Sequence, residues 1–586
     1  MKTRKYVPQI AILVMALFFT YRTSAQVTAD WSLSPNLYKY SSNGYAVQGD
    51  SKIVTASDGS IIVAGSATDG ALYNSITNPA AGRVIIQKYS STGTLLSEYL
   101  DVDADWGDAP LLYPIGLNNG VLDLLIDEAD NIYFIETQSD IVTVGTTLYK
   151  GIRAVVKLDA NMNLEWKHTS PDNNWLSMIF DSEGNVIVNG STKNNGDGSS
   201  SNIVTAKYNI SGDLLWTVVF PGNGNYVDYG NDVSADASGN SYVTGGIGTA
   251  ASGLSAITIK YDADGNQLWT SSYDFNVAST ASDQGGSIVT APNGNTYVVL
   301  TSDVGVGKNR PIILKYNTSG ELIWNINIEA DAPNGQLYPV RIRLDANENV
   351  YMGAYRYRAH IGSLYSEWGY SIQLYKFKAD GTFRWNAKKS TARLYDFDVT
   401  ASGDVYVAGT SGTSAQTFAA RYNKAGNLIW EDVYSPDVIE QQTFSTSGGS
   451  CVGINPNHPD EVTIGGNVIV KNASNVYSTA WVVRHFGGTL KTGNALLTTG
   501  DLHLQVSPNP AGDLVQLSID NNESVTGTLQ VFDVSGKLME TISAVDFTNG
   551  NSITLNTSTW NSGIYFCKIT SAENNLLKPV KLLVQH

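Results

Sequence analysis

The sequence predicts an all-β protein: a β-propeller of eight four-stranded blades, with seven as the alternative, followed by a small Ig-like β-sandwich. Three observations predict this architecture. A turn-and-strand motif returns about every 55 residues, a hairpin motif ending in tryptophan alternates with it, and no stretch of the repeat region shows sustained helical spacing. Units of this length that hold four short strands each are typical of propeller blades.

The first segment, residues 1–25, has the pattern of a secretory signal peptide. Lys2, Arg4 and Lys5 precede an apolar run at 10–19, and small residues end at Ala25. We therefore expect cleavage between Ala25 and Gln26. The apolar run is too short for a membrane-spanning helix, and no later segment approaches the roughly 20 apolar residues that such a helix needs. We expect no transmembrane span.

The repeat region is predicted to extend over residues 26–490. Its first motif is a turn and a strand, best seen in DASGNSYVTG at 236–245, where glycine supplies the positive φ of a tight turn. The aligned turn positions step by 55, 55, 54 and 55 residues. These positions are Gly184, Gly239, Gly294, Glu348 and Gly403. The motif occurs at 56–65, 127–136, 181–190, 236–245, 291–300, 345–354 and 400–409, with a degenerate copy at 455–466.

The second motif is a hairpin, as in ITIKYDADGNQLW at 257–269. Apolar and polar residues alternate before the turn, which is the period of a strand. The motif places a tryptophan in six of the units, and we interpret this series as packing between neighbouring blades, because its spacing follows the blade period. A ligand platform of aromatic side chains is the alternative. The series is Trp166, Trp216, Trp269, Trp324, Trp385 and Trp430.

The first and last segments of the repeat region predict how the ring closes. The eighth unit ends at 481–486 without a tryptophan strand, whereas Trp31 stands in an isolated strand before the first repeat. We expect the Trp31 strand to complete the eighth blade beside residues 480–486.

The repeat resembles the extracytoplasmic β-propeller repeats of the family labelled SBBP. The segments DASGNSYVTG and KYDADGNQLW carry the resemblance, which covers most of residues 48–486. It implies a scaffold of exported proteins without shared catalytic residues.

Residues 491–501 lack periodicity and are predicted to be a linker, and residues 502–586 form a second domain of short strands separated by turns. Four motifs occur there in order: SPNPAGD at 507–513, VFDVSGKLM at 531–539, GIYFCKI at 563–569 and KPVKLLV at 578–584. This set resembles the type A sorting domain of the type IX secretion system. The matching positions are Pro508, Asn509, Pro510, Gly536, Gly563, Tyr565 and Lys581.

The second resemblance implies an export route. The signal peptide would deliver the protein to the periplasm of a Gram-negative bacterium, and the C-terminal domain would direct it through the outer membrane. The implied partners are the type IX translocon and a sortase-like peptidase that removes the domain. The protein would then be extracellular or attached to the outer surface. The sequence does not decide between attachment and release.

Composition excludes some functions. The 54 acidic and 37 basic residues give a formal charge of −17, which repels nucleic-acid phosphates. Cys451 and Cys567 lie far apart, so a disulfide framework is not expected. We expect a monomer.

Sequence motifs for catalysis or metal binding are weak. The chain contains no HExxH and no GxSxG. Asp101, Asp103 and Asp105 alternate before a glycine and could surround a calcium ion, although the spacing departs from an EF-type loop. A solvated acidic insertion is the favoured interpretation. We predict no catalytic residue, no metal and no cofactor, with calcium as the alternative.

Two hypotheses for function remain. The first is a non-enzymatic binding or adhesion protein that recognises an unknown glycan or protein through loops at one mouth of the propeller. The second is a secreted carbohydrate-active enzyme, a glycosidase or lyase, with its active site in the propeller channel. Clustered carboxylates with raised pKa values at that mouth would favour the enzyme. A rim lined by tyrosine or tryptophan would favour binding.

Overall fold

The computed structural model shows two compact units, Met1–Gly488 and Thr489–His586, and the elements in the described residues are β-strands. No helix long and apolar enough to cross a membrane occurs among the described residues. The structure describes residues 25–26, 31–33, 38–39, 52–68, 82–101, 120–144, 146–192, 200–222, 224, 226–249, 253–275, 282–303, 309–329, 335–358, 369–411, 416–434, 443–471, 477–487, 504–507, 511–519, 526–533, 537–546, 552–571 and 580–585.

The strands of the first unit form eight antiparallel sheets in the described residues, numbered here in chain order. Sheets 1 to 4 each have four strands. Sheet 1 contains β4 (Lys52–Thr55), β5 (Ile61–Thr68), β6 (Gly82–Tyr89) and β7 (Leu95–Leu100). Sheet 2 contains β8 (Val121–Ile126), β9 (Ile132–Val144), β10 (Thr146–Leu158) and β11 (Leu164–Ser170). Sheet 3 contains β12 (Asn173–Phe180), β13 (Val186–Thr192), β14 (Ile203–Tyr208) and β15 (Leu214–Phe220). Sheet 4 contains β16 (Tyr229–Ala235), β17 (Ser241–Thr249), β18 (Gly253–Tyr261) and β19 (Gln267–Tyr273).

Sheets 5 to 8 continue the series. Sheet 5 contains β20 (Asp283–Thr290), β21 (Thr296–Asp303), β22 (Asn309–Tyr316) and β23 (Leu322–Asn327). Sheet 6 contains β24 (Gly335–Leu344), β25 (Val350–Arg358), β26 (Gly369–Phe377) and β27 (Phe383–Ser390). Sheet 7 contains β28 (Ala392–Val399), β29 (Val405–Ser411), β30 (Gln416–Tyr422), β31 (Leu428–Tyr434) and the two-residue β1 (Ala25–Gln26), which runs parallel to β31. Sheet 8 contains β32 (Thr443–Ile454), β33 (Val462–Lys471), β34 (Tyr477–Phe486), β2 (Trp31–Leu33) and, beside β34, β3 (Tyr38–Lys39).

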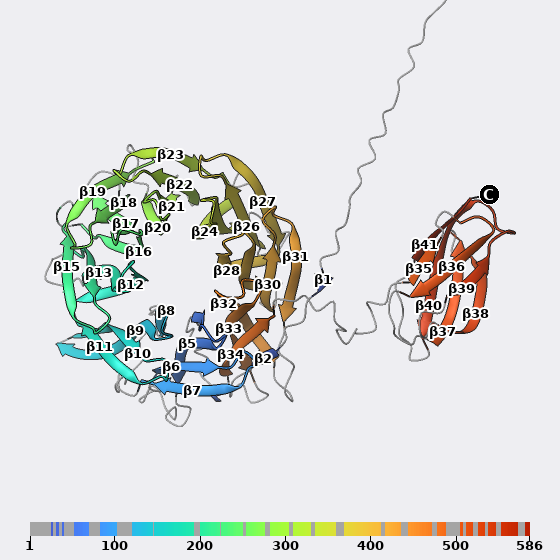
Figure 1. The fold of residues 1–586 in the computed structure, drawn as a ribbon, viewed down its shortest axis with the longest axis horizontal. Coiled ribbons are helices and arrows are strands. Elements are labelled where there is room, and N and C mark those ends of the chain that lie inside the picture. Colours follow the sequence, from blue (N-terminus) through green and yellow to red (C-terminus); the bar gives the residue numbers. More distant parts are fainter. Residues whose placement is uncertain are drawn as a thin grey trace, which may run out of the picture. The chain divides into compact units, whose positions relative to one another are not determined.

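The sheets are arranged as a ring, with the first strand of each sheet nearest the centre (Figure 1). Each of these innermost strands contacts the innermost strand of the next sheet, from β4 through β8, β12, β16, β20, β24 and β28 to β32. The ring closes because β32 also contacts β4. This is the arrangement of a β-propeller.

The two ends of the propeller meet in sheet 8. β2 pairs antiparallel with β34, with Trp31 opposite His485 and Leu33 opposite Val483. The predicted closure by the Trp31 strand is therefore confirmed. Two short strands from the N-terminal end, β2 and β3, thus pair with β34 on the outer side of a sheet whose β32, β33 and β34 come from the C-terminal end of the repeat region.

The repeated turns follow from their sequence. In the turn of sheet 4, one carboxylate oxygen of Asp236 accepts hydrogen bonds from the backbone N–H groups of Ser238 at 2.9 Å and Asn240 at 3.0 Å. Gly239 has φ 78°, a conformation that glycine adopts without steric cost. At the aligned position of sheet 6, Glu348 takes the left-handed conformation with φ 55°.

The two ends of the ring differ. Tight turns join the first strand to the second and the third to the fourth, so they lie at one end, which we call the turn end. Connections from the second strand to the third, such as 69–81 and 359–368, and from one sheet to the next leave from the other end, which we call the loop end. Alternation of direction in antiparallel sheets fixes this separation.

The second unit consists of two small sheets around one core. The first sheet contains β35 (Leu504–Ser507), β36 (Leu514–Ile519) and β39 (Ile553–Asn556). The second contains β37 (Thr526–Asp533), β38 (Leu538–Asp546), β40 (Gly563–Ser571) and β41 (Val580–Val584). Leu517 and Leu555 of the first sheet pack with Leu529, Val531 and Leu582 of the second.

Candidate functional site

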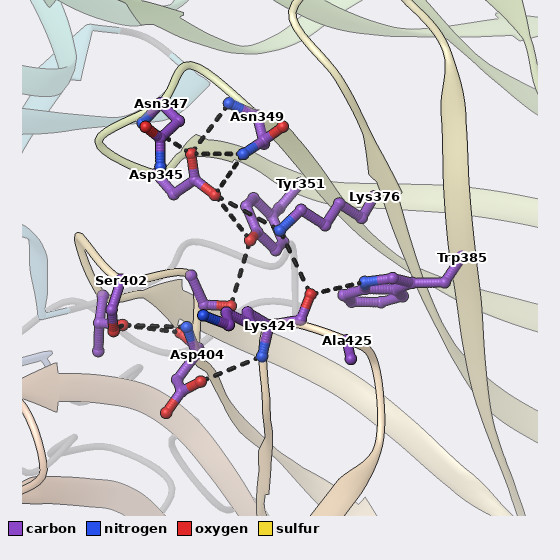
Figure 2. A network of polar contacts seen from close by, with 12 residues as sticks. Asp345, Asn347, Asn349, Tyr351, Lys376, Trp385, Ser402, Asp404, Lys424 and Ala425 are labelled. Atoms are coloured by element: carbon purple, nitrogen blue, oxygen red, sulfur yellow. Dashed lines mark hydrogen bonds and ion pairs between the residues drawn. The ribbon is translucent and has the colours of Figure 1, made fainter.

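Side chains that recur in the repeat form a polar network between neighbouring sheets, shown for sheets 6 and 7 in Figure 2. Asp345 in the first turn of sheet 6 accepts a hydrogen bond from the Tyr351 hydroxyl at 2.9 Å, and that hydroxyl lies 3.2 Å from the carbonyl oxygen of Gly403 in sheet 7. Lys376 donates to the carbonyl oxygen of Lys424 at 3.3 Å. The network therefore joins the turn of one sheet to two turns of the next.

Tryptophan completes this junction. The indole N–H of Trp385 donates to the carbonyl of Lys424 at 3.0 Å, so one carbonyl accepts from both Lys376 and Trp385. The same pair of donors recurs at three other junctions. Lys157 and Trp166 donate to Ile210, Lys207 and Trp216 to Ala263, and Lys315 and Trp324 to Ala379.

The remaining two tryptophans of the series also lie between sheets. Trp269 donates to the carbonyl of Thr318 at 3.1 Å. Trp430 is buried and stacks on Phe486 of sheet 8, with 4.8 Å between ring centroids. The indole rings lie against turn glycines of the next sheet, including Gly265 beside Trp216 and Gly320 beside Trp269. The periodic residues are thus engaged in holding sheets together, so a functional site is to be sought where the repeat is broken.

The innermost strands carry different side chains at equivalent positions. In seven of the eight innermost strands, the pairing with the second strand of the same sheet shifts register at a β-bulge or irregularity. The residue just after the shift pairs with the fourth residue of that second strand. In sheet 1 the equivalent position pairs with Ala64. We call these eight positions the inner belt. It consists of Lys52, Asp123, Ser177, Asp232, Ser287, Arg341, Asp396 and Cys451.

Asp232 is the most connected carboxylate of the inner belt. It accepts hydrogen bonds from the hydroxyls of Ser177 at 2.8 Å and Ser287 at 3.0 Å, on the two neighbouring sheets. The backbone N–H of Ile288 adds a third at 3.0 Å. These donors hold the carboxylate as a bridge across three sheets.

Asp396 bridges in the same way. It accepts a hydrogen bond from the Arg341 guanidinium at 2.9 Å and one from the backbone N–H of Val452 at 3.1 Å. Two residues further along the same two strands, Arg343 donates to Asp398 at 3.2 Å. Two arginines of β24 are therefore neutralised by two aspartates of β28.

Asp123, the third aspartate of the inner belt, has a raised pKa. It accepts a hydrogen bond from the backbone N–H of Met178 at 2.8 Å, while burial raises its pKa above the ordinary value of an aspartate. The positive charges of Lys52 and Arg341 act in the opposite direction. Arg341 belongs to sheet 6 and Asp123 to sheet 2, so charges from opposite sheets of the ring influence one another.

A group of tyrosines around one arginine lies beside the inner belt, at the junction of sheets 6 and 7. We call it the tyrosine–arginine cluster. The Arg393 guanidinium carbon lies 4.8 Å from the ring centroid of Tyr355, 5.2 Å from that of Tyr370 and 4.9 Å from that of Tyr395. Tyr338 stacks on Tyr355 at 5.3 Å, and Tyr357 lies 5.4 Å from Tyr370. The cluster consists of Tyr338, Tyr355, Tyr357, Tyr370, Arg393 and Tyr395.

The cluster lies towards the loop end of the ring. Tyr338, Tyr370 and Arg393 stand near the beginnings of β24, β26 and β28, and Tyr357 stands near the end of β25. Tyr395, on an innermost strand, is 38% exposed. The cluster therefore extends from the centre of the ring outward along sheet 6.

The residues predicted for calcium are only partly described. Asp103 and Asp105 lie outside the described residues, whereas Asp101 is buried and pairs with Lys167. Lys167 also pairs with Glu136 at 2.7 Å. No group of three or more histidine, cysteine or acidic side chains suited to a metal occurs in the described part of the chain.

The predicted sorting residues are also only partly described. Pro508, Asn509, Pro510 and Gly536 fall outside the described residues, and Lys581 lies in β41 opposite Phe566. Gly563 faces Val584 in the same pair of strands. Tyr565 is buried and donates from its hydroxyl to the carbonyl of Asn561 at 2.8 Å, which is a structural role.

Sequence reasoning missed both the inner belt and the tyrosine–arginine cluster. The belt has a signal in the sequence, because Ser177, Asp232, Ser287, Arg341 and Asp396 follow one another at steps of 55, 55, 54 and 55 residues, the same steps as the turn glycines. The cluster has no such signal in the sequence, because its tyrosines come from three strands of sheet 6 and one strand of sheet 7.

Comparison with known proteins identifies the second unit. Residues 505–585 match the family model described as "Secretion system C-terminal sorting domain". This domain marks proteins secreted by the type IX system, so the protein is extracellular or attached to the cell surface. A search of curated proteins found no match.

Solved structures offer only distant similarity to this chain. The WD40 domain of SCAP from fission yeast is 7% identical with a TM-score of 0.36, covering 78% of this chain and 98% of that one. A protein of unknown function from Dyadobacter fermentans is 10% identical with a TM-score of 0.34, covering 77% and 99%. A polysaccharide lyase of family PL25, an ulvan lyase, is 11% identical with a TM-score of 0.35, covering 68% and 95%. Similarity at this level says nothing about function, and the propeller fold follows from the sheets themselves.

Proposed function

We propose that this protein is a binding or adhesion protein whose β-propeller recognises its ligand at the loop end. The C-terminal domain serves as its sorting signal for type IX secretion. One observation carries the binding function: the tyrosine–arginine cluster is the place where the propeller repeat is replaced by a concentration of aromatic side chains with a charged group. Rings of this kind supply large contact area at low entropic cost.

The inner belt supports binding over catalysis. Asp232 and Asp396 each accept hydrogen bonds from neighbouring sheets, which gives these carboxylates a structural task. A glycosidase of the common type needs two carboxyl groups placed on either side of the scissile bond, one of them with a raised pKa. Burial raises the pKa of Asp123, and the other two belt carboxylates, Asp232 and Asp396, are engaged by donors of neighbouring sheets.

The second candidate function is a carbohydrate-active enzyme, and Asp123 is the observation that favours it. A carboxyl group whose pKa is raised by burial is better suited to donate a proton to a leaving group. Lys52 and Arg341 would then face the developing negative charge. In that case product would form, and Asp123→Asn would abolish it while leaving retention on the substrate intact.

Binding and turnover can be measured on the same material. Residues 26–586 would be applied to immobilised polysaccharides, host glycans and matrix proteins, and both retention and release of products would be recorded. The proposed function predicts saturable retention without product. Product release that Asp123→Asn abolishes would replace it with the enzyme, and absence of retention on every surface would refute it.

A further inference from the structure

The charge of the chain is unevenly distributed. Residues 335–400, which form sheet 6 and the first strand of sheet 7, contain ten lysines and arginines against six acidic residues, in a chain whose net charge is −17. The tyrosine–arginine cluster is built entirely from this segment. The segment that supplies the cluster is therefore basic within an acidic chain, which favours a negatively charged ligand.

Arg393 provides the anchoring charge. Its neighbouring acidic residues, Asp396 and Asp398, are paired with Arg341 and Arg343. The structure shows no salt bridge to Arg393 among the described residues, and its buried Nε has no hydrogen-bond acceptor there. A buried N–H without an acceptor is costly, so a ligand oxygen that reached this donor would relieve that cost.

The geometry around Arg393 favours an anion that presents two oxygen atoms side by side. The guanidinium lies over the rings of Tyr355, Tyr370 and Tyr395, and these contacts restrict the orientation of the side chain. A guanidinium held in this way binds carboxylate and sulfate groups in the plane of its N–H donors, often through two parallel hydrogen bonds. A lysine would offer a point charge without this plane.

The tyrosines indicate the rest of the ligand. Three tyrosine rings, those of Tyr355, Tyr370 and Tyr395, lie around Arg393, and Tyr395 exposes 38% of its surface. Tyrosine combines an apolar ring face with a hydroxyl, which suits a ligand that has apolar faces and many hydroxyl groups. Recognition of an acidic peptide relies instead on clusters of several arginines.

We propose that the tyrosine–arginine cluster binds an acidic polysaccharide, with Arg393 holding a carboxylate or sulfate group and the tyrosine rings contacting the sugar rings. This inference rests on the proposed function and names its ligand class. It assigns no reaction to the cluster.

The test measures the affinity of residues 26–586 for polygalacturonate, dextran sulfate, unsubstituted dextran and polyglutamate. The expected result is saturable binding to one or both acidic polysaccharides, and affinity at least about tenfold lower for dextran and polyglutamate, because charge-assisted hydrogen bonds are lost or the rings lack a sugar face. Preference for polygalacturonate identifies a carboxylate, and preference for dextran sulfate identifies a sulfate.

Three variants assign the binding to the cluster. Arg393→Gln should weaken binding at least about tenfold, and Arg393→Lys should recover only part of it, because lysine keeps the charge without the planar donors. Tyr395→Ala removes an exposed ring and should also weaken binding while leaving thermal stability unchanged. Arg384→Gln, which removes an equal charge from an exposed position on β27, serves as the matched control and should bind as the parent does.

The outcomes separate this inference from the proposed function. Saturable binding to dextran, polyglutamate or a matrix protein but to neither acidic polysaccharide would overturn the inference and leave a binding protein. Equal affinity of the parent, Arg393→Gln and Tyr395→Ala for the acidic polysaccharide would place the site elsewhere and likewise overturn it. Loss of affinity in Arg384→Gln equal to that in Arg393→Gln would show general electrostatic attraction in place of a site.

Discussion

At four junctions between neighbouring sheets, a single backbone carbonyl accepts hydrogen bonds from a lysine and a tryptophan of the preceding sheet. For the junction of sheets 6 and 7 these donors are Lys376 and Trp385. The lysine lies over Tyr351 at 4.6 Å, and that tyrosine meets the tryptophan edge to face at 6.0 Å. The repeated lysine, tyrosine and tryptophan thus have a structural task at this junction.

The first prediction concerns Trp269, which represents the tryptophan series. Trp269→Ala should lower the free energy of unfolding by about 2 kcal/mol, because the ring packs against Tyr242 and Tyr316 and donates to the next sheet. Leu268→Ala, at the adjacent and 52% exposed position, should change it by less than about 0.5 kcal/mol. Urea unfolding of both variants measures the difference, and equal effects would refute the junction role.

The second prediction concerns Glu136, which is buried beside Lys167 and Asp101. Burial raises the pKa of Glu136 to about 8. In the unfolded chain this group loses its proton near the ordinary glutamate value, so between about pH 5 and pH 8 the folded state holds more protons than the unfolded state. Its contribution to stability therefore decreases as the pH rises through that range.

The variant Glu136→Gln removes this titration. Its free energy of unfolding relative to the parent should increase from pH 5 to pH 8, as measured by chemical denaturation at several pH values. A difference between the two proteins that is constant with pH would contradict the assignment.

At the scale of elements, the turns and second strands could be predicted from the sequence and the site could not. The period of Gly184, Gly239 and Gly403 marks a local backbone requirement, namely positive φ in a tight turn, and local requirements are visible in a single sequence. The neighbours of Arg393 depend on which strands end side by side. Tyr338, Tyr355 and Tyr370 are separated in the sequence and meet only when sheet 6 has formed and sheet 7 packs on it.

Closure of the ring by β2 leads to the third prediction. Replacing Trp31, Ser32 and Leu33 by Pro, Gly and Pro should lower the stability of the first unit by roughly 2–3 kcal/mol, because proline cannot donate to the strand pair with β34. The matched control replaces all three residues by threonine, which keeps a strand-forming backbone. Thermal unfolding compares the two variants, and equal stability would show that β2 contributes no closing pair.

At the scale of the whole molecule, export and the proposed recognition belong to separate units. The propeller has the tyrosine–arginine cluster towards its loop end, and the second unit has its own core of residues such as Leu517 and Leu582. The sequence comparison assigns the second unit to secretion and leaves the first without an assigned ligand. Recognition is therefore a property to be tested on the propeller, and export on the C-terminal unit.

The fourth prediction concerns export. Deleting residues 502–586 should leave a folded propeller in the periplasm, because the sorting signal is absent while the core of the first unit is complete. Cell fractionation and protease protection measure the location. Arg393→Gln in the full chain should be exported normally, and normal surface display of the truncated chain would refute the sorting role.

The most direct test of the central claim, that the ring binds its ligand at the loop end of sheets 6 and 7, is hydrogen exchange with and without an acidic polysaccharide. Residues 26–586 would be compared in both states by mass spectrometry. We predict slowed exchange in peptides covering the beginnings of β24 and β28 and the end of β25. Slowed exchange confined to the turn end, at residues 345–349 and 400–404, or to other sheets would contradict the claim.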